Sequence, residues 1–147
     1  MFRGRAVHTI DTKGRLSIPA GFRVELERHS ERAPILTNQL DCLALYPYEA
    51  WRKIERELEE ASPLQPEVQD LQRFLISGAV ESPVDKQGRI SIPPYLREHA
   101  GLDKEVTIAG VGPRIEVWDR ARFEQSLTRT QARFNEISAT VAKGRPS

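Results

Sequence analysis

The sequence predicts a mixed α+β fold, mainly β, in which two copies of one small unit are related by a pseudo-twofold axis. Residues 11–19 (DTKGRLSIP) recur 74 positions later as residues 85–93 (DKQGRISIP), with six of nine positions identical. Arg23 and Arg97 keep the same offset. Alternating apolar and polar residues around both copies indicate half-buried strands, and apolar residues three to four apart between the copies indicate helices.

A second similarity follows each copy of the repeat. Residues 43–46 (LALY) precede Trp51, and residues 115–118 (IEVW) precede Phe123. Because both similarities occur in the same order, we interpret the chain as two homologous halves that complete each other's core. The predicted parts are a first half at 5–50, a helical connector at 51–78, a second half at 79–122, and a C-terminal helix with a frayed tail from Lys143 at 123–147.

The first half is expected to begin with a strand over residues 2–10. Its buried face would hold Phe2, Ala6 and Ile10. Arg3 and Arg5 project from the other face, since successive side chains of a strand alternate. A tight turn at residues 11–14 follows, because an aspartate side chain can cap a turn and glycine accepts a positive φ.

The alternation resumes after this turn, with Leu16 and Ile18 pointing inward. Pro19 ends the strand and can begin a short helix, where its missing N–H costs little. That helix would dock through Phe22 and Leu26, four residues apart. A hairpin built from residues 34–37 and 42–46 completes the half.

The second half repeats this order. Residues 79–84 lead into the second turn, and Ile90 and Ile92 point inward after it. A helix after Pro93 docks through Leu96, and residues 105–109 and 114–118 form a hairpin around the glycines and proline between them.

Helices are predicted for the connector and the C-terminal segment. The connector carries two apolar stripes, formed by Trp51, Ile54 and Leu58 and by Val68, Leu71 and Leu75. The C-terminal segment is predicted as one helix with Phe123, Leu127, Phe134, Ile137 and Val141 on roughly one face. We expect this last face to pack on a neighbouring subunit, because it is longer than a small domain needs to cover.

Composition excludes several classes of protein. With 39% hydrophobic and 29% charged residues, the 147-residue chain can bury a core. It has no run of eighteen apolar residues and no apolar segment typical of a signal peptide, so we expect a cytoplasmic protein without a membrane partner. Cys42 is the single cysteine, which excludes an intrachain disulfide and a Cys-rich zinc site, and we expect it to be a small buried apolar residue.

Charge is segregated along the chain although the net charge is only +1. Residues 1–23 hold five basic side chains and one acidic side chain, or +4, whereas residues 49–70 hold seven acidic and three basic side chains, or −4. The acidic segment is interpreted as a solvated helix face with internal pairs such as Arg56–Glu60. The basic segment can bind a polyanion even in a near-neutral protein.

No arrangement of residues predicts an enzyme, a metal site or a cofactor site. His8, His29 and His99 lack the spacing of metal ligands. The sequence contains no glycine-rich phosphate loop, no serine nucleophile elbow and no HExxH motif. We therefore expect no catalytic residues and no small-molecule substrate.

The repeated turns carry the candidate chemistry. Asp11 and Gly14 in the first turn, and Asp85 and Gly88 in the second, are the residue types that stabilise a turn. Arg15 and Arg89 have two interpretations. Each can pair with its own aspartate and serve the turn alone, or it can pair with one face of its guanidinium and offer other donors to phosphate.

Further basic side chains favour the second interpretation, although most lysines on loops are simply solvated. Lys13 and Lys86 lie within the turns, and Arg3 and Arg5 lie on the strand before the first turn. Two basic turns related by a pseudo-twofold could face one DNA duplex together. The candidate DNA-binding residues are Arg15, Arg89, Lys13, Lys86, Arg3 and Arg5.

These motifs together resemble the MraZ family from residue 1 to about residue 125. The matching segments are residues 1–4 (MFRG), 11–19, 45–47 (LYP) with Trp51, 88–92 (GRISI), 96–102 (LREHAGL) and 117–119 (VWD). The resemblance implies membership of the SpoVT/AbrB superfamily, whose fold is a swapped-hairpin, double-psi-like barrel. It also implies that the DNA-contacting arginines are those of the two Asp-x-x-x-Arg motifs, Asp11 to Arg15 and Asp85 to Arg89.

The resemblance implies a function and partners as well. MraZ proteins regulate transcription of the division and cell wall gene cluster, bind short direct repeats in double-stranded DNA upstream of their own gene, associate with the nucleoid and form homo-oligomeric rings. An alternative left open by the sequence is a ring-forming protein-interaction or antitoxin-like module whose basic turns bind an acidic partner.

Overall fold

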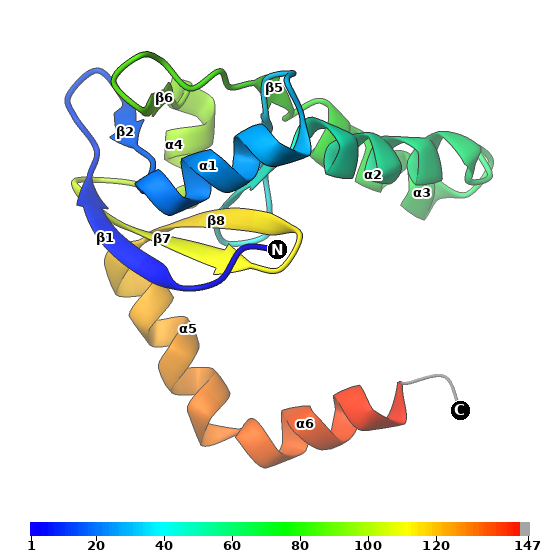
Figure 1. Ribbon diagram of the computed structural model, residues 1–147. Coiled ribbons are helices and arrows are strands. Elements are labelled where there is room, and N and C mark those ends of the chain that lie inside the picture. Colours follow the sequence, from blue (N-terminus) through cyan, green and yellow to red (C-terminus); the bar gives the residue numbers. More distant parts are fainter. Residues whose placement is uncertain (145–147) are drawn as a thin grey trace.

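The main sheet of the protein has six antiparallel strands in the order β1-β7-β8-β4-β3-β5, and a separate two-stranded sheet pairs β2 with β6 (Figure 1). The structure, a computed structural model, describes residues 1–144. The strands are β1 (Arg5–Thr9), β2 (Arg15–Ser17), β3 (Ile35–Asn38), β4 (Leu43–Tyr46), β5 (Val80–Glu81), β6 (Arg89–Ser91), β7 (Glu105–Val111) and β8 (Arg114–Asp119).

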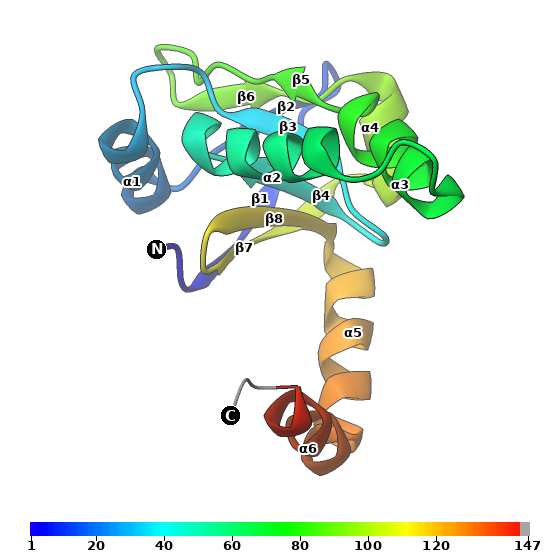
Figure 2. The same ribbon diagram turned by 90° about the vertical axis from the view of Figure 1, so that its right-hand side faces the viewer.

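The helices lie around these sheets and below them. They are α1 (Ala20–His29), α2 (Tyr48–Glu60), α3 (Pro66–Leu71), the π-helical η1 (Gln72–Ile76), α4 (Pro94–Ala100), α5 (Arg120–Ala132) and α6 (Phe134–Lys143). In Figure 2, α5 and α6 extend downward from the end of β8, on the side of the molecule opposite to β2 and β6. None of the described helices is both long enough and apolar enough to cross a membrane.

The expected closed barrel does not form, and the expectation of a mainly β fold is wrong. The main sheet is open, with β1 and β5 at its edges. Strands β2 and β6 have three residues each and pair only with one another. Because the connector and the C-terminal segment are helical, helices hold more of the described residues than strands do.

Both halves contribute to one core, as the repeat predicts. Leu16 from the first copy and Ile90 from the second are fully buried at the centre of the small sheet. The same cluster includes Leu36, Leu43 and Leu45 from the first half and Leu96, Val106, Ile108, Ile115 and Val117 from the second. A second cluster lies under α2, where Trp51 packs against Ile35, Ala44 and Tyr46.

The first strand is shorter than predicted but keeps the predicted faces. Phe2 and Ile10 are buried, whereas Arg3 and Arg5 are exposed. Gly4 adopts a positive φ of 89°, so the extended backbone of β1 begins after it. Phe2 still forms an isolated bridge with Gly112 on the next hairpin.

The C-terminal segment is two helices rather than one. The helix breaks at Arg133, whose φ of −116° and ψ of 20° end α5 and begin α6. The predicted apolar stripe is therefore not one continuous face, and Phe134 and Val141 are 62% and 58% exposed. Of the predicted frayed tail, Lys143 is the last residue of α6, and residues 145–147 lie outside the described part of the chain.

The acidic helix α2 pairs its charges differently from the prediction. Arg52, rather than Arg56, provides the cation, with Nη1 2.5 Å from Glu55 Oε1 and 3.5 Å from Glu59 Oε1. Spacings of three and seven residues place these carboxylates on the face that also carries Arg52.

Candidate nucleic-acid interface

The first repeated turn is organised by the Asp11 carboxylate. Asp11 Oδ1 accepts hydrogen bonds from the backbone N–H groups of Lys13 and Arg15, both at 2.9 Å. Asp11 Oδ2 accepts from Nε of the Arg15 side chain at 2.7 Å. Gly14 closes the turn with a φ of 81°, a value that side chains disfavour.

The second turn repeats this geometry around Asp85. Its Oδ1 accepts from the backbone of Gln87 at 2.8 Å and of Arg89 at 2.9 Å, and its Oδ2 accepts from Arg89 Nε at 3.2 Å. Gly88 has a φ of 79°. Each arginine therefore pairs with its own aspartate, which confirms the predicted pairing.

These hydrogen bonds lower the pKa of both aspartates. The backbone N–H of Arg15 is the main cause at Asp11, and the backbone N–H of Arg89 is the main cause at Asp85. Hydrogen bonds to the ionised form favour it. Both carboxylates are therefore ionised at neutral pH and hold the arginine side chains in place.

The two turns are joined by the pairing of β2 with β6. Leu16 lies opposite Ile90, and these two residues occupy equivalent positions in the repeat. On either side, Ile18 N–H donates to Gly88 O at 2.9 Å and Ile92 N–H donates to Gly14 O at 2.8 Å. The ladder thus has a local twofold relation through Leu16 and Ile90, with one turn at each end.

Alternation on this ladder brings Arg15 and Arg89 to the same face. Leu16 and Ile90 point into the core, so their neighbours point outward. Arg15 and Arg89 lie diagonally opposite one another, with side chains 34% and 26% exposed. Both turns lie at the top of the molecule in Figures 1 and 2, away from α5 and α6.

The other predicted basic residues separate into two groups. Lys13 and Lys86 are exposed on the turns, beside the paired arginines. Arg3 and Arg5 lie at the opposite end of β1, because the turn follows Thr9. The Arg5 guanidinium carbon lies 5.6 Å from the ring centroid of Phe123 on α5, an attractive cation–π distance. The structure therefore brings four of the six candidates together.

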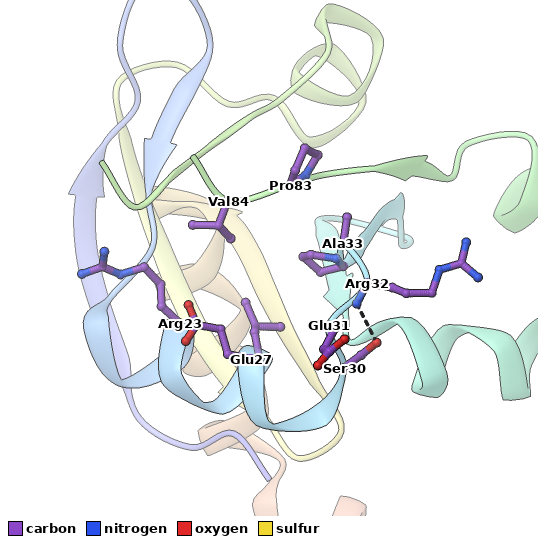
Figure 3. A pocket seen from close by; sticks show the side chains of 10 residues that line it. Arg23, Glu27, Ser30, Glu31, Arg32, Ala33, Pro83 and Val84 are labelled. Carbon is purple, nitrogen blue, oxygen red and sulfur yellow. Dashed lines mark hydrogen bonds between the residues drawn. The ribbon is translucent and has the colours of Figure 1, made fainter. Parts of the chain in front are cut away.

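Arg23 and Arg97 also contribute to this region, although sequence reasoning gave them no role. Each lies against the glycine of the turn in the other half. Figure 3 shows Arg23 at one end of a surface pocket of about 270 Å³, with Arg32 at the other end. Pro83 and Val84, just before the second turn, line the same pocket. The shared 74-residue offset was the only signal in the sequence.

The described part of the chain offers neither a metal site nor a reactive thiol. Among residues 1–144, no group of three or more His, Cys, Asp or Glu side chains is arranged to hold a metal ion. Cys42 is buried at 3% exposure, as predicted. Burial, followed by the nearby Glu116 carboxylate, raises the pKa of its thiol to about 12, so the thiol is protonated at neutral pH.

Known proteins match this chain over almost its whole length. The family model described as "MraZ protein, putative antitoxin-like" matches twice, at residues 1–74 and 75–144. A protein named transcriptional regulator MraZ from Solidesulfovibrio magneticus is 46% identical over 147 residues, which covers 98% of this chain and 97% of that protein.

Two further relatives with the same name match this chain to a similar extent. The protein from Syntrophobacter fumaroxidans is 40% identical over 96% of this chain and 94% of its own length. The protein from Alkaliphilus oremlandii is 42% identical over 97% of this chain and 98% of its own length. The match of both halves to one family model, and identity of this level over nearly full length, show that the chain belongs to the MraZ family.

Proposed function

We propose that this protein is a sequence-specific transcriptional regulator that binds double-stranded DNA with its two Asp-x-x-Gly-Arg turns. The names of the relatives support regulation of transcription. The observation that carries the proposal is the β2–β6 ladder, which presents Arg15 and Arg89 on one outward face. A twofold arrangement of basic groups suits a duplex, whose two backbones are also related by twofold axes.

The arginines and lysines of each turn have different roles in this proposal. Asp11 and Asp85 occupy the Nε donors of Arg15 and Arg89, so the remaining guanidinium N–H groups can donate to phosphate or to a guanine edge. Gly14 and Gly88 permit the turn. In this scheme the lysines at the tips, Lys13 and Lys86, bind phosphate and position the protein, while the arginines contribute to sequence reading.

Arg3 and Arg5 have a secondary place in this proposal. They would reach phosphates only where the duplex continues along β1, and Arg5 would have to leave the ring of Phe123. We propose that they extend the basic surface without reading bases. Their removal should weaken binding to all DNA sequences about equally.

The proposed targets follow the family. They are short direct repeats upstream of the protein's own gene, within the division and cell wall gene cluster, bound by a cytoplasmic, nucleoid-associated ring of identical subunits. A ring would present several pairs of turns, and successive repeats would bind with increased effective concentration. We further propose that residues 5–50 and 79–122 are two SpoVT/AbrB-like halves of swapped-hairpin type, in which β2 and β6 cross between halves.

The test is DNA binding by full-length variants. Fluorescence anisotropy should compare the region upstream of the gene with a shuffled duplex of the same composition. Replacement of both Arg15 and Arg89 by alanine should weaken specific binding by about 1–3 kcal/mol per arginine, and so by about 30-fold or more for the pair, because a bidentate base contact is lost at each site. The melting temperature should change little, because both side chains are partly exposed and the backbone N–H groups of residues 15 and 89 still bind Asp11 and Asp85.

The matched control is the double variant Arg28→Ala and Arg73→Ala. It also removes two guanidinium groups, both from exposed helix positions at 73% and 69% side-chain exposure. This variant should bind nearly as tightly as the unmodified protein. Equal loss in both double variants would mean that charge alone matters and would reject the assignment of the turns.

The alternative function is a ring-forming interaction or antitoxin-like module that binds an acidic partner. The exposed apolar residues of α6, Phe134 and Val141, favour a protein contact somewhere on this chain. The same titration separates the two functions. An interaction module would bind the upstream and shuffled duplexes equally, whereas a regulator would prefer the upstream duplex.

A further inference from the structure

Arg23 on α1 and Arg97 on α4 are equivalent residues of the repeat, and each reaches across to the other half. A Cβ atom placed on Gly14 would lie 2.8 Å from Arg97 Cζ and 2.9 Å from Arg97 Nε. A Cβ atom placed on Gly88 would lie 2.7 Å from Arg23 Cζ. The guanidinium of each half therefore occupies the space beside the turn glycine of the other half.

These guanidinium groups are not held by ordinary polar pairing at Nε. In the described part of the chain, the Nε atoms of Arg23 and Arg97 are buried and have no hydrogen-bond partner. A buried donor without a partner carries a free-energy cost. Because this cost recurs at both equivalent positions, it argues that the two arginines do more than stabilise α1 and α4.

We propose that Arg23 and Arg97 are positioning residues that act across the two halves, with Arg97 setting the first turn and Arg23 setting the second. This inference rests on the proposed DNA-binding function of the turns. A flat guanidinium can pack closely on a backbone that lacks a side chain, and glycine is the residue that offers such a surface.

The contact is placed where it can orient the DNA-facing arginine. Gly14 is the residue before Arg15, and its carbonyl accepts the hydrogen bond from Ile92 N–H at 2.8 Å. Ile92 O would also lie 2.9 Å from a Cβ atom on Gly14. Arg97 and the second-half backbone thus enclose Gly14 from two sides. Loss of Arg97 would free Gly14 and, through it, Arg15.

The second turn has the equivalent contact with Arg23 and the equivalent backbone hydrogen bond. Gly88 precedes Arg89, and its carbonyl accepts from Ile18 N–H at 2.9 Å. Arg23 comes from the helix that begins after Pro19, only a few residues beyond Ile18. Each half therefore supports the other half's turn, in addition to the aspartate with which each turn holds its own arginine.

The test measures each turn separately in the full-length protein without DNA. Hydrogen–deuterium exchange, read by mass spectrometry on peptides that cover residues 9–17 and 83–91, should compare Arg97→Ala, Arg97→Lys, Arg23→Ala and Arg23→Lys with Arg28→Ala as control. Substitution of Arg97 should speed exchange at 9–17 more than at 83–91. Substitution of Arg23 should do the reverse. Lysine should not rescue either turn, because it keeps the charge but lacks the flat group.

DNA affinity is measured on the same variants. Each single substitution should weaken specific binding by about tenfold, as a binding constellation does when its supporting contacts are lost. The lysine variants should retain the salt dependence of the unmodified protein. The Arg28→Ala control should change neither turn exchange nor affinity.

Three results would overturn the proposal. One is faster exchange only in the turn of the same half, and another is equal exchange changes in both turns. The third is weaker DNA binding with unchanged exchange, which would make these arginines direct DNA contacts. If the unmodified protein fails to bind any duplex, the proposed function fails, while the exchange pattern still decides whether the arginines position the opposite turns. A variant that unfolds is replaced in this comparison by its lysine counterpart.

Discussion

At the scale of single residues, one carboxylate in each turn fixes both the backbone and a guanidinium. Asp11 accepts two backbone N–H groups and the Arg15 side chain, and Asp85 does the same for Arg89. Sequence spacing could predict this pairing because both partners lie four residues apart in a tight turn. It could not predict the places of Arg23 and Arg97, because a contact between distant segments leaves no local pattern.

Low pH should destabilise the turns, because it protonates Asp11 and Asp85. Their pKa values are lowered in the folded state, so their contribution to the free energy of unfolding is present above the ordinary value of 3.8 and is lost as pH falls through the lower folded-state pKa. The stability advantage of the unmodified protein over Asp11→Asn/Asp85→Asn should therefore shrink below that value. Urea titrations from about pH 6 to about pH 3 measure it. An advantage that stays constant with pH would contradict this assignment.

At the scale of elements, local periodicity predicts strands and helices but not how short strands pair. Alternation correctly predicts the β7–β8 hairpin and the inward residues of β2 and β6. The partner of β2 lies 74 residues away, so only the structure shows that the two copies pair with one another. The break at Arg133 has no proline or glycine signal, which is why a single helix was expected.

The pairing of β2 with β6 predicts that both copies of the repeat contribute to the stability of one core. Leu16 and Ile90 are equivalent, face each other and are both fully buried. Replacement of either by alanine should reduce the free energy of unfolding by about 2–5 kcal/mol, because each leaves a cavity in the same core. Chemical denaturation measures the loss. Val24→Ala, at a position 51% exposed, is the control and should change stability far less. A near-neutral effect at one of the two core positions would mean that the halves do not share the core equally.

At the scale of the whole molecule, the basic turns and the C-terminal helices lie on opposite sides. The basic turns lie at one end, and α5 and α6 extend from the opposite side (Figure 2). This separation leaves the turns clear of α5 and α6, and the apolar side chains of Phe134 and Val141 on α6 are exposed. The net charge of +1 hides this arrangement, because the acidic connector offsets the basic N-terminal segment.

The salt dependence of DNA affinity should show whether the turn lysines contact phosphate. Each phosphate contact contributes a slope of about −0.9 in log K against log salt concentration. Replacement of Lys13 and Lys86 by alanine should therefore make the slope shallower by about 0.9 for each lysine that contacts phosphate. Binding isotherms over a range of salt concentrations give this value. An unchanged slope would show that the lysines do not meet phosphate.

Local DNA cleavage can show whether both turns face one duplex. Cys42 is buried with a raised thiol pKa, so it should not react in the folded protein. An iron chelate can then be attached selectively to Lys13→Cys, to Lys86→Cys or, as a control, to Arg28→Cys. If both turns face the duplex, cleavage falls within the same binding site from positions 13 and 86, and none occurs from position 28. Cleavage from only one turn, or from position 28 alone, would contradict that arrangement.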